Sequence, residues 1–229
     1  MKARVVSKKG AHYVFLGREL TLSALDLNIT VKGQELTLTP NRPLTVFDGQ
    51  LDGALTVTLV EDPAYDTRLR FKNNDFGALM KTFFHNDKVT GRIGGELVLR
   101  GAFSDWKTMR GHGTLTVRDG ALYNIPFLGG LSDLLNVIIP DMGYAKASEA
   151  ESKFTVSDGV IQMSRLDIHS LFFVLIGHGH YDFIGDNLEL DMRVNLRGAP
   201  GVATWLLSKM FEYHGTGPIT KTKWETKNF

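Results

Sequence analysis

Apolar and polar residues alternate with a period of two along most of this chain. The clearest case is residues 188–197, LELDMRVNLR, in which every second side chain is apolar. Because successive side chains of a β-strand point to opposite faces of a sheet, each such segment has one apolar and one polar face. Strands of this kind build antiparallel sheets covered on one side, whereas the strands of a buried parallel sheet are apolar throughout. The pattern predicts a mainly β, antiparallel fold.

Turn-forming residues separate the alternating segments. Asp-Gly pairs stand at positions 48–49, 52–53, 119–120 and 158–159, and this dipeptide favours the tight turns that join antiparallel strands. The spacing of the turns predicts about ten to twelve strands. Two V-x-D-G segments, which begin at Val117 and Val156, each predict a hairpin of strand, turn and strand.

Three segments depart from the alternation and predict about three short amphipathic helices. The first follows the capping residues Asn74 and Asp75, the second spans residues 127–139 between two prolines, and the third lies near residues 202–212. An apolar stripe on a helix usually packs against a core, so each helix is expected to lie on the apolar face of the sheet. The side chains expected to plug the sheet or face a membrane are Leu131, Leu135, Ile138, Trp205 and Phe211.

Composition narrows the possible functions. The chain has 229 residues, 26 of them basic and 25 acidic, so its net charge is +1. This balance offers no electrostatic surface for nucleic acid, and the sequence shows no strong signal for an oligomer.

The chain contains no cysteine, which excludes disulfides and cysteine-ligated zinc. No segment reaches the roughly 20 apolar residues that span a bilayer, so the protein is either cytosolic or part of a longer chain.

Candidate chemistry is sparse. His178 and His180 fall on one face of an expected strand, where they could bind a metal if a third ligand came from elsewhere. As an alternative, both lie on the polar face of the sheet without a ligand. The sequence contains no phosphate-binding loop, nucleophile elbow or zinc-protease motif. We therefore expect no catalytic residue, no metal, no cofactor and no enzymatic activity.

The apolar face of the sheet is the remaining candidate for function. A sheet must hide such a face from water, either as a closed core or as a trough that another molecule fills. Burying an acyl chain gains about 0.8 kcal/mol per methylene, so a strongly curled sheet, an open groove or barrel-like, could hold lipid without catalytic residues. The residues expected to line a lipid groove are Leu25, Leu27, Ile29, Leu97, Leu99, Leu115, Val117, Leu188, Leu190, Met192 and Val194.

Four stretches follow one another along the chain, at residues 73–115, 111–140, 154–183 and 213–224. In this order their motifs resemble the C-terminal region of the AsmA-like family of bacterial envelope proteins (the TamB/AsmA type). Residues 73–115 resemble the family's helix, its G-x-I-x-G-x-L-x-L-x-G strand and the strand that returns. GHGTLTVRDGALYNIPFLGGLSDLLNVIIP at residues 111–140 resembles the D-G turn and I-P helix, and residues 154–183 the hairpin and strand pair that follow. YHGTGPITKTKW at residues 213–224 resembles the family's closing segment, except that the family's proline near the tryptophan is absent and Lys223 precedes Trp224.

The resemblance covers roughly residues 64–224, so we expect an AsmA-like region at 64–229. Residues 1–63 fit only as further alternating strands, which would continue the same sheet. Members of the family are anchored in the inner membrane, extend through the periplasm as a curled sheet with an apolar groove, and are implicated in moving phospholipid towards the outer membrane. In that setting the helix at 127–139 would plug the groove or contact a membrane.

The resemblance implies a lipid-binding, lipid-transfer segment in the periplasm, with phospholipid or another acyl lipid as partner. The anchor of a longer protein would lie outside this chain. A second hypothesis is a scaffold that assists outer-membrane protein assembly and binds envelope membrane proteins by strand addition, at residues 1–10 or 188–197. A third is a metal-dependent enzyme that uses His178 and His180.

Overall fold

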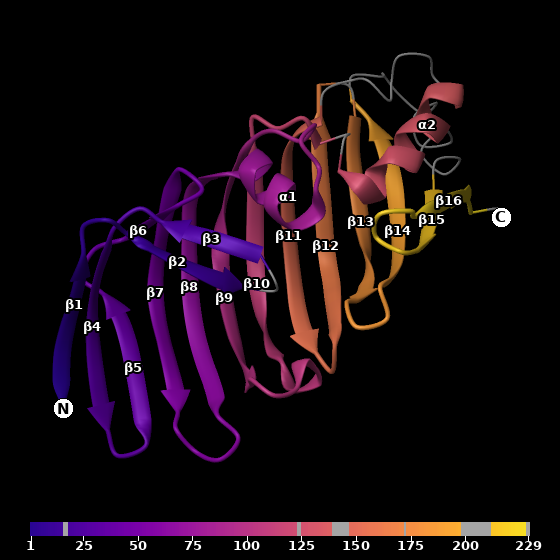
Figure 1. Cartoon of the computed structure of the whole chain (residues 1–229). Coiled ribbons are helices and arrows are strands. Elements are labelled where there is room, and N and C mark those ends of the chain that lie inside the picture. The colour runs from indigo at the N-terminus through magenta and orange to yellow at the C-terminus, as the bar shows by residue number, and fades with distance from the viewer. Residues whose placement is uncertain (16–17, 123–124, 139–146, 172, 198–211, 228–229) are drawn as a thin grey trace.

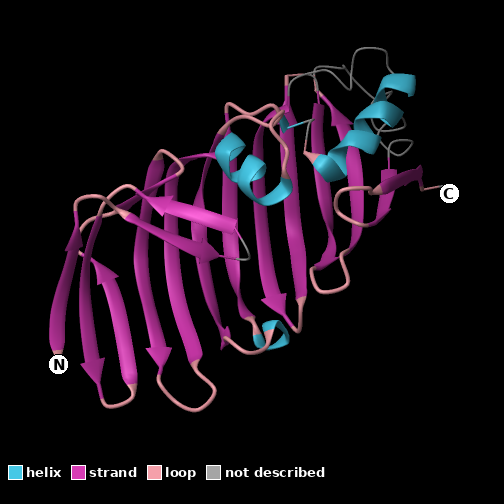
Figure 2. Cartoon of the chain, viewed as in Figure 1, coloured by secondary structure: helices cyan, strands magenta, loops and turns pink. Residues whose placement is uncertain are grey.

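The computed structural model describes residues 1–15, 18–122, 125–138, 147–171, 173–197 and 212–227. Strands dominate the chain, and most of them join one large sheet (Figures 1 and 2). The strands are β1 (Lys2–Ser7), β2 (Ala11–Phe15), β3 (Arg18–Leu22), β4 (Leu25–Lys32), β5 (Glu35–Pro40), β6 (Leu44–Val46), β7 (Gly49–Thr58), β8 (Ala64–Asp75), β9 (Arg92–Ala102), β10 (Arg110–Arg118), β11 (Ala147–Ser157), β12 (Val160–Ser170), β13 (Phe173–Asp182), β14 (Asn187–Leu196), β15 (Glu212–Gly217) and β16 (Lys223–Thr226). The helices are α1 (Phe76–Phe84), α2 (Gly129–Ile138) and the 3-10 helices η1 (Trp106–Thr108) and η3 (Pro126–Leu128).

The large sheet is antiparallel and contains 14 strands. Its hydrogen-bonded path runs β1-β4-β5-β7 and then in chain order from β8 to β16, while β6 pairs with β7. The prediction of a mainly β, antiparallel fold is confirmed. Within the described residues, β1 pairs only with β4 and β16 only with β15, so these strands do not close into a barrel. The predicted strong curl is not confirmed.

Strand register places the alternating apolar residues of neighbouring strands on one face. Leu38 of β5 lies opposite Leu55 of β7, and Leu69 of β8 lies opposite Leu97 of β9. Bulges in β8 and β12 each add a residue without reversing the faces, since Ile93 and Leu166 remain on the apolar side. The apolar face is therefore continuous from one edge strand to the other.

Helices and a separate hairpin lie over this face. Figure 1 shows α1, α2 and the β2–β3 hairpin on the same side of the sheet, with the hairpin crossing β7 to β9. The predicted cap of α1 is confirmed, because the Asp75 carboxylate accepts a hydrogen bond from the Ala78 backbone N–H at 3.0 Å. Phe76 and Met80 of α1 and Leu131 of α2 are buried in one core cluster with the sheet. The third predicted helix lies outside the described residues.

Some sequence expectations about turns were wrong. The turn at Asp158-Gly159 joins β11 to β12 as predicted. After Asp119-Gly120, by contrast, the chain leaves the sheet towards η3, and Asp52-Gly53 lies inside β7 rather than at a turn. The described residues contain sixteen strands, more than expected. Four of them, β2, β3, β6 and β16, have only three to five residues, and an alternating pattern is hard to recognise over so short a segment. In the same residues we find no helix with the length and hydrophobicity needed to span a membrane.

Candidate functional site on the apolar face

The candidate site is the apolar face of the large sheet, which we call the apolar floor. Its rows cross many strands: one runs from Leu69 through Leu97, Gly113, Phe154 and Met163, strand by strand. Among the described residues, no paired position on the floor carries a charged side chain. A surface of this composition can hold hydrocarbon by burial alone.

All eleven residues predicted to line a lipid groove lie on the apolar floor. They differ in exposure along the sheet. Leu25, Leu27, Ile29, Leu97, Leu99 and Leu115 are half-buried, whereas Val117, Leu188, Leu190, Met192 and Val194 are buried. We call Leu27, Leu38, Leu55, Leu69, Leu97 and Leu99 the open floor, and Leu188, Leu190, Met192, Val194 and Tyr213 the capped floor. The open floor is therefore partly accessible to solvent, whereas the capped floor is covered.

The capped floor is covered by η3 and α2. Leu128 and Leu131, at 3% and 1% exposed, are buried in the same cluster as the capped floor. The indole N–H of Trp224 on β16 donates a hydrogen bond to the Phe127 carbonyl oxygen at 2.7 Å, which fastens η3 to the edge of the sheet. The side chains of Leu135 and Ile138 in α2 are not described, and Trp205 and Phe211 lie outside the described residues.

On the capped floor and on β16 beside it, large side chains lie across glycines of neighbouring strands. A Cβ atom on Gly177 would meet the Met192 sulfur at 2.1 Å, and one on Gly215 would meet the Trp224 ring at 2.8 Å. Both glycines face their large neighbours directly in the register. The sheet therefore fills this half of its apolar face with its own side chains and with α2.

The open floor contains an apolar hollow with a volume of about 150 Å³. It is lined by aliphatic side chains from β4 to β8, and Gly53 forms part of its wall. The sequence pattern did not predict this hollow. The signal in the sequence was the Pro40-to-Pro43 segment, which interrupts the alternation; the structure places Pro40 and Gly53 on the same hollow.

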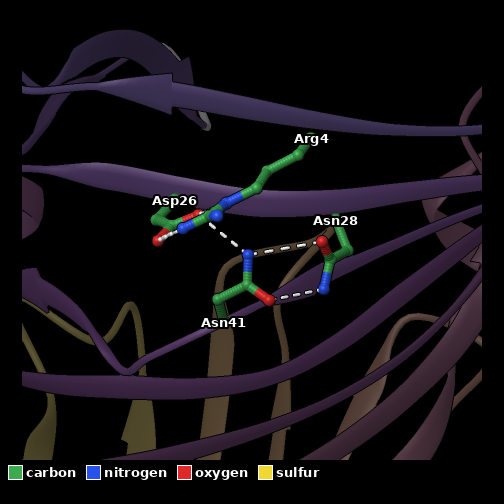
Figure 3. A network of polar contacts seen from close by, with 4 residues as sticks. All are labelled: Arg4, Asp26, Asn28 and Asn41. Atoms are coloured by element: carbon green, nitrogen blue, oxygen red, sulfur yellow. Dashed lines mark hydrogen bonds and ion pairs between the residues drawn. The ribbon is translucent and has the colours of Figure 1, made fainter.

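The polar face near β1 carries a hydrogen-bonded network of Arg4, Asp26, Asn28 and Asn41 (Figure 3). Nε and Nη2 of Arg4 donate to the two Asp26 carboxylate oxygens, each at 2.8 Å, and Nδ2 of Asn41 donates to Asp26 Oδ1 at 2.8 Å. These hydrogen bonds, from Arg4 first and Asn41 second, hold the pKa of Asp26 well below its usual range. The network fastens β1 and the β5–β6 connection to β4.

The histidines singled out in the sequence lie on the polar face of β13. The Nε2 atom of His178 is 3.9 Å from an Asp191 oxygen, and that of His180 is 3.7 Å from a Glu189 oxygen, so the two pair with different carboxylates. Asp191 also accepts hydrogen bonds from His214 at 2.7 Å and Lys227 at 2.8 Å. Among the described residues, no three histidine or acidic side chains are grouped in a way that could hold a metal ion.

The two segments expected to offer a free strand edge differ in position. β1, within residues 1–10, is an edge strand, and six of its residues pair with β4 alone. Residues 188–197 belong largely to β14, which pairs with β13 on one side and β15 on the other. Residues 188–193 already form ladders on both sides, so this part of the second segment offers no free edge for strand addition.

Comparison with known proteins does not place the chain in a family. No protein-family model matches the chain, and neither the curated proteins nor the solved structures gave a significant match. A proposal for the function therefore rests on the geometry of the apolar floor.

Proposed function

We propose that this chain is a lipid-binding, lipid-transfer segment of a bacterial envelope protein related to the AsmA-like family. Its apolar floor would shield phospholipid acyl chains in the periplasm, between the inner and outer membranes, as a strongly curled groove within a longer, inner-membrane-anchored protein. The observation that carries the proposal is the uncharged apolar floor, which crosses the sheet from edge to edge and is only half-buried over the open floor.

The energetics favour acyl chains as the ligand of the open floor. Each methylene moved from water onto an apolar surface gains about 0.8 kcal/mol, and the leucines of the open floor offer aliphatic contacts without a charged group. Phospholipid headgroups would stay in water beside the sheet. In the proposal, η3 and α2 end the groove at the capped floor, where Leu131 occupies the space that a lipid would need.

Lipid extraction from the purified protein tests the proposal. The chain is expressed in bacteria, purified without detergent and extracted with chloroform and methanol, and the extract is analysed by mass spectrometry. We expect phospholipid in molar proportion to protein. Protein that is folded, yet yields no lipid and binds none from vesicles, would contradict the proposal.

A charge placed on the open floor provides a matched comparison. Leu97 and Val98 are neighbours on β9 and both are half-buried, but Leu97 faces the apolar floor and Val98 faces the polar side. We expect Leu97→Glu to lower the bound lipid several-fold, because a carboxylate would have to lose its water beside acyl chains. Val98→Glu should leave the bound lipid unchanged. Equal losses in the two variants would show that general destabilisation, not the floor, is responsible.

A second candidate function is a scaffold that binds an envelope membrane protein by strand addition. The observation that favours it is β1, an edge strand exposed along most of its length, with Val5 and Val6 at 41% and 55% exposed. An added strand would pair with the free backbone groups of β1. Photo-crosslinking from Val6 to an envelope protein in cells, with none from the exposed Thr114 of β10, which is paired on both sides, would favour the scaffold over the lipid carrier.

A further inference from the structure

The hollow in the open floor arises from an interruption in the sheet. β5 pairs with β7 from Glu35–Leu38, and β6 pairs with the same side of β7 from Leu44–Val46. Between these ladders, residues 52–54 of β7 have no paired residue on that side, although they pair with residues 68–70 of β8 on the other. Beside residues 52–54 of β7, the floor therefore lacks a neighbouring strand on the side of β5 and β6.

The connection between β5 and β6 is held away from the gap. It begins after Pro40, which has no N–H to donate to a ladder. The Asn41 backbone N–H donates to the Asp26 carbonyl oxygen at 2.9 Å, and its side chain joins the polar-face network of Figure 3. The Gly53 N–H on β7 is satisfied by its neighbour's carboxylate, Asp52 Oδ1, at 2.8 Å. The gap thus persists without leaving these groups unpaired.

Gly53 keeps the hollow free of a side chain. Its φ of 146° and the carbonyl oxygen of Arg68, which would lie 1.9 Å from a Cβ atom, together restrict this position to glycine. The three atoms nearest to that Cβ position all belong to the backbone of β8. On the capped floor, in contrast, the Met192 side chain lies over Gly177.

The chemistry of the hollow fits a hydrocarbon. Its wall is formed by leucines from five strands, β4 to β8, together with Pro40 and Ala54, and almost all of its surface is apolar. The leucines are Leu27, Leu38, Leu44, Leu51, Leu55 and Leu69. Enclosed apolar cavities of about 150 Å³ bind small hydrocarbons; this hollow has a similar volume and lining but is open on the side of the floor. The nearby Asp52 carboxylate accepts a hydrogen bond from the Gly53 N–H, and the leucine side chains offer a ligand no hydrogen-bonding group.

We infer that this hollow binds the methyl end of a saturated acyl chain whose remaining length lies along the open floor. The inference rests on the proposed lipid-binding function and adds to it a specific subsite and an orientation. The chain would lie with its methyl end between β5 and β8 and its carboxyl or headgroup end outside the hollow. A lipid held only by general contact with the floor would have no reason to place its methyl end at this hollow.

Filling the hollow with a large side chain tests the inference. Leu38→Trp places an indole in the hollow, and Leu36→Trp places one on the same strand and face, outside its lining. The probe is palmitic acid, with shorter saturated fatty acids for comparison, measured by equilibrium binding to the full chain. Each methylene excluded from an apolar site weakens binding about fourfold. We expect Leu38→Trp to bind palmitate at least about tenfold more weakly, and Leu36→Trp to bind it within about twofold of the unchanged protein.

Photolabelling of the unchanged protein gives a measurement that does not depend on the folding of a variant. A palmitic acid analogue with a diazirine near its methyl end should label peptides that contain Leu38, Leu55 or Leu69. An analogue with the diazirine near its carboxyl end should label other peptides. Labelling of the same peptides by both analogues would overturn the inferred orientation.

The outcomes separate this inference from the proposed function. If the unchanged protein binds palmitate and the two tryptophan variants bind it equally, the hollow is not a subsite, although the floor still binds lipid. If the unchanged protein binds neither palmitate nor phospholipid, both the inference and the proposed function fail. Tenfold weaker binding confined to Leu38→Trp, with methyl-end labelling at the hollow, supports both.

Discussion

The indole N–H of Trp224 donates a hydrogen bond to the carbonyl oxygen of Phe127 at 2.7 Å. The two residues are far apart in the chain, yet the bond joins the last strand of the sheet to η3 at the start of the segment that covers the capped floor. The Trp224 ring also lies against Gly130 of α2 and Gly215 of β15. One side chain thus connects the edge of the sheet to its cover.

Replacing Trp224 with phenylalanine should loosen this cover. The substitution retains an aromatic ring but removes the donor, so we expect the free energy of unfolding to fall by about 0.5–1.5 kcal/mol. Urea unfolding measures this change, and hydrogen exchange should become faster in η3 and α2 before other segments. Trp106→Phe is the control, since Trp106 is exposed and its replacement should change neither measurement. Unchanged exchange in η3 would show that the hydrogen bond does not hold the cover.

Two adjacent glycines of α2 should respond differently to alanine. Gly129 is in a right-handed helical conformation, and a Cβ atom there would meet nothing within 4 Å. Gly129→Ala should therefore stabilise the protein by about 0.4–1 kcal/mol, because alanine restricts the unfolded chain. At Gly130 a Cβ atom would lie 3.2 Å from Trp224 Cδ1, so Gly130→Ala should gain less or destabilise. Thermal unfolding of the two variants measures the difference, and equal gains would contradict the packing of Trp224 on α2.

The faces of the sheet could be predicted from the sequence because a period of two is a local property. Leu188, Leu190 and Met192 alternate with charged residues, and neighbouring strands need only pair in phase for one apolar face to form. The cap of α1 was likewise local, since Asp75 binds the N–H of a residue three positions later.

Features that depend on distant pairing could not be predicted in this way. Asp52-Gly53 and Asp158-Gly159 are the same dipeptide, but the first lies in β7 because β8 pairs along its whole length, and only the second forms a turn. The hollow beside Gly53 depends on where β5 ends and β6 begins along β7. Pro40 and Pro43 signal an interruption in the strands, but they do not indicate which residues of β7 it leaves unpaired. The half-buried state of the open floor depends in turn on where α2 and the β2–β3 hairpin lie.

The hydroxyl of Tyr213 predicts a stabilising substitution. Tyr213 is fully buried in the capped floor, its hydroxyl has no hydrogen-bond partner among the described residues, and burial raises its pKa. A buried hydroxyl without a partner costs about 1–3 kcal/mol, so Tyr213→Phe should raise the free energy of unfolding by about 1 kcal/mol. Tyr181→Phe is the matched control, because the Tyr181 hydroxyl donates to Asp186 at 3.0 Å and its loss should not stabilise. Urea unfolding distinguishes the two signs.

The Arg4–Asp26 pair predicts an acid-sensitive contribution to stability at the β1 edge. Hydrogen bonds from Arg4 and Asn41 lower the pKa of Asp26 in the folded protein, so the folded state binds its proton less readily than the unfolded state does. The resulting stabilisation is complete above the ordinary aspartate pKa of about 3.9 and is lost as the pH falls below it towards the folded-state value. Asp26→Asn removes the charge and should abolish this dependence.

Urea unfolding of the unchanged protein and Asp26→Asn at pH 7, 5, 4 and 3 measures the effect. We expect the unchanged protein to be more stable at pH 7 and 5, and the difference to shrink at pH 4 and further at pH 3. Asp158→Asn is the control, because Asp158 pairs with Arg110 at 3.0 Å between two exposed side chains, and exposed pairs contribute little. A difference between the unchanged protein and Asp26→Asn that is the same at every pH would mean that the network acts through shape and neutral hydrogen bonds. The charge on Asp26 would then not be what holds β1 to β4.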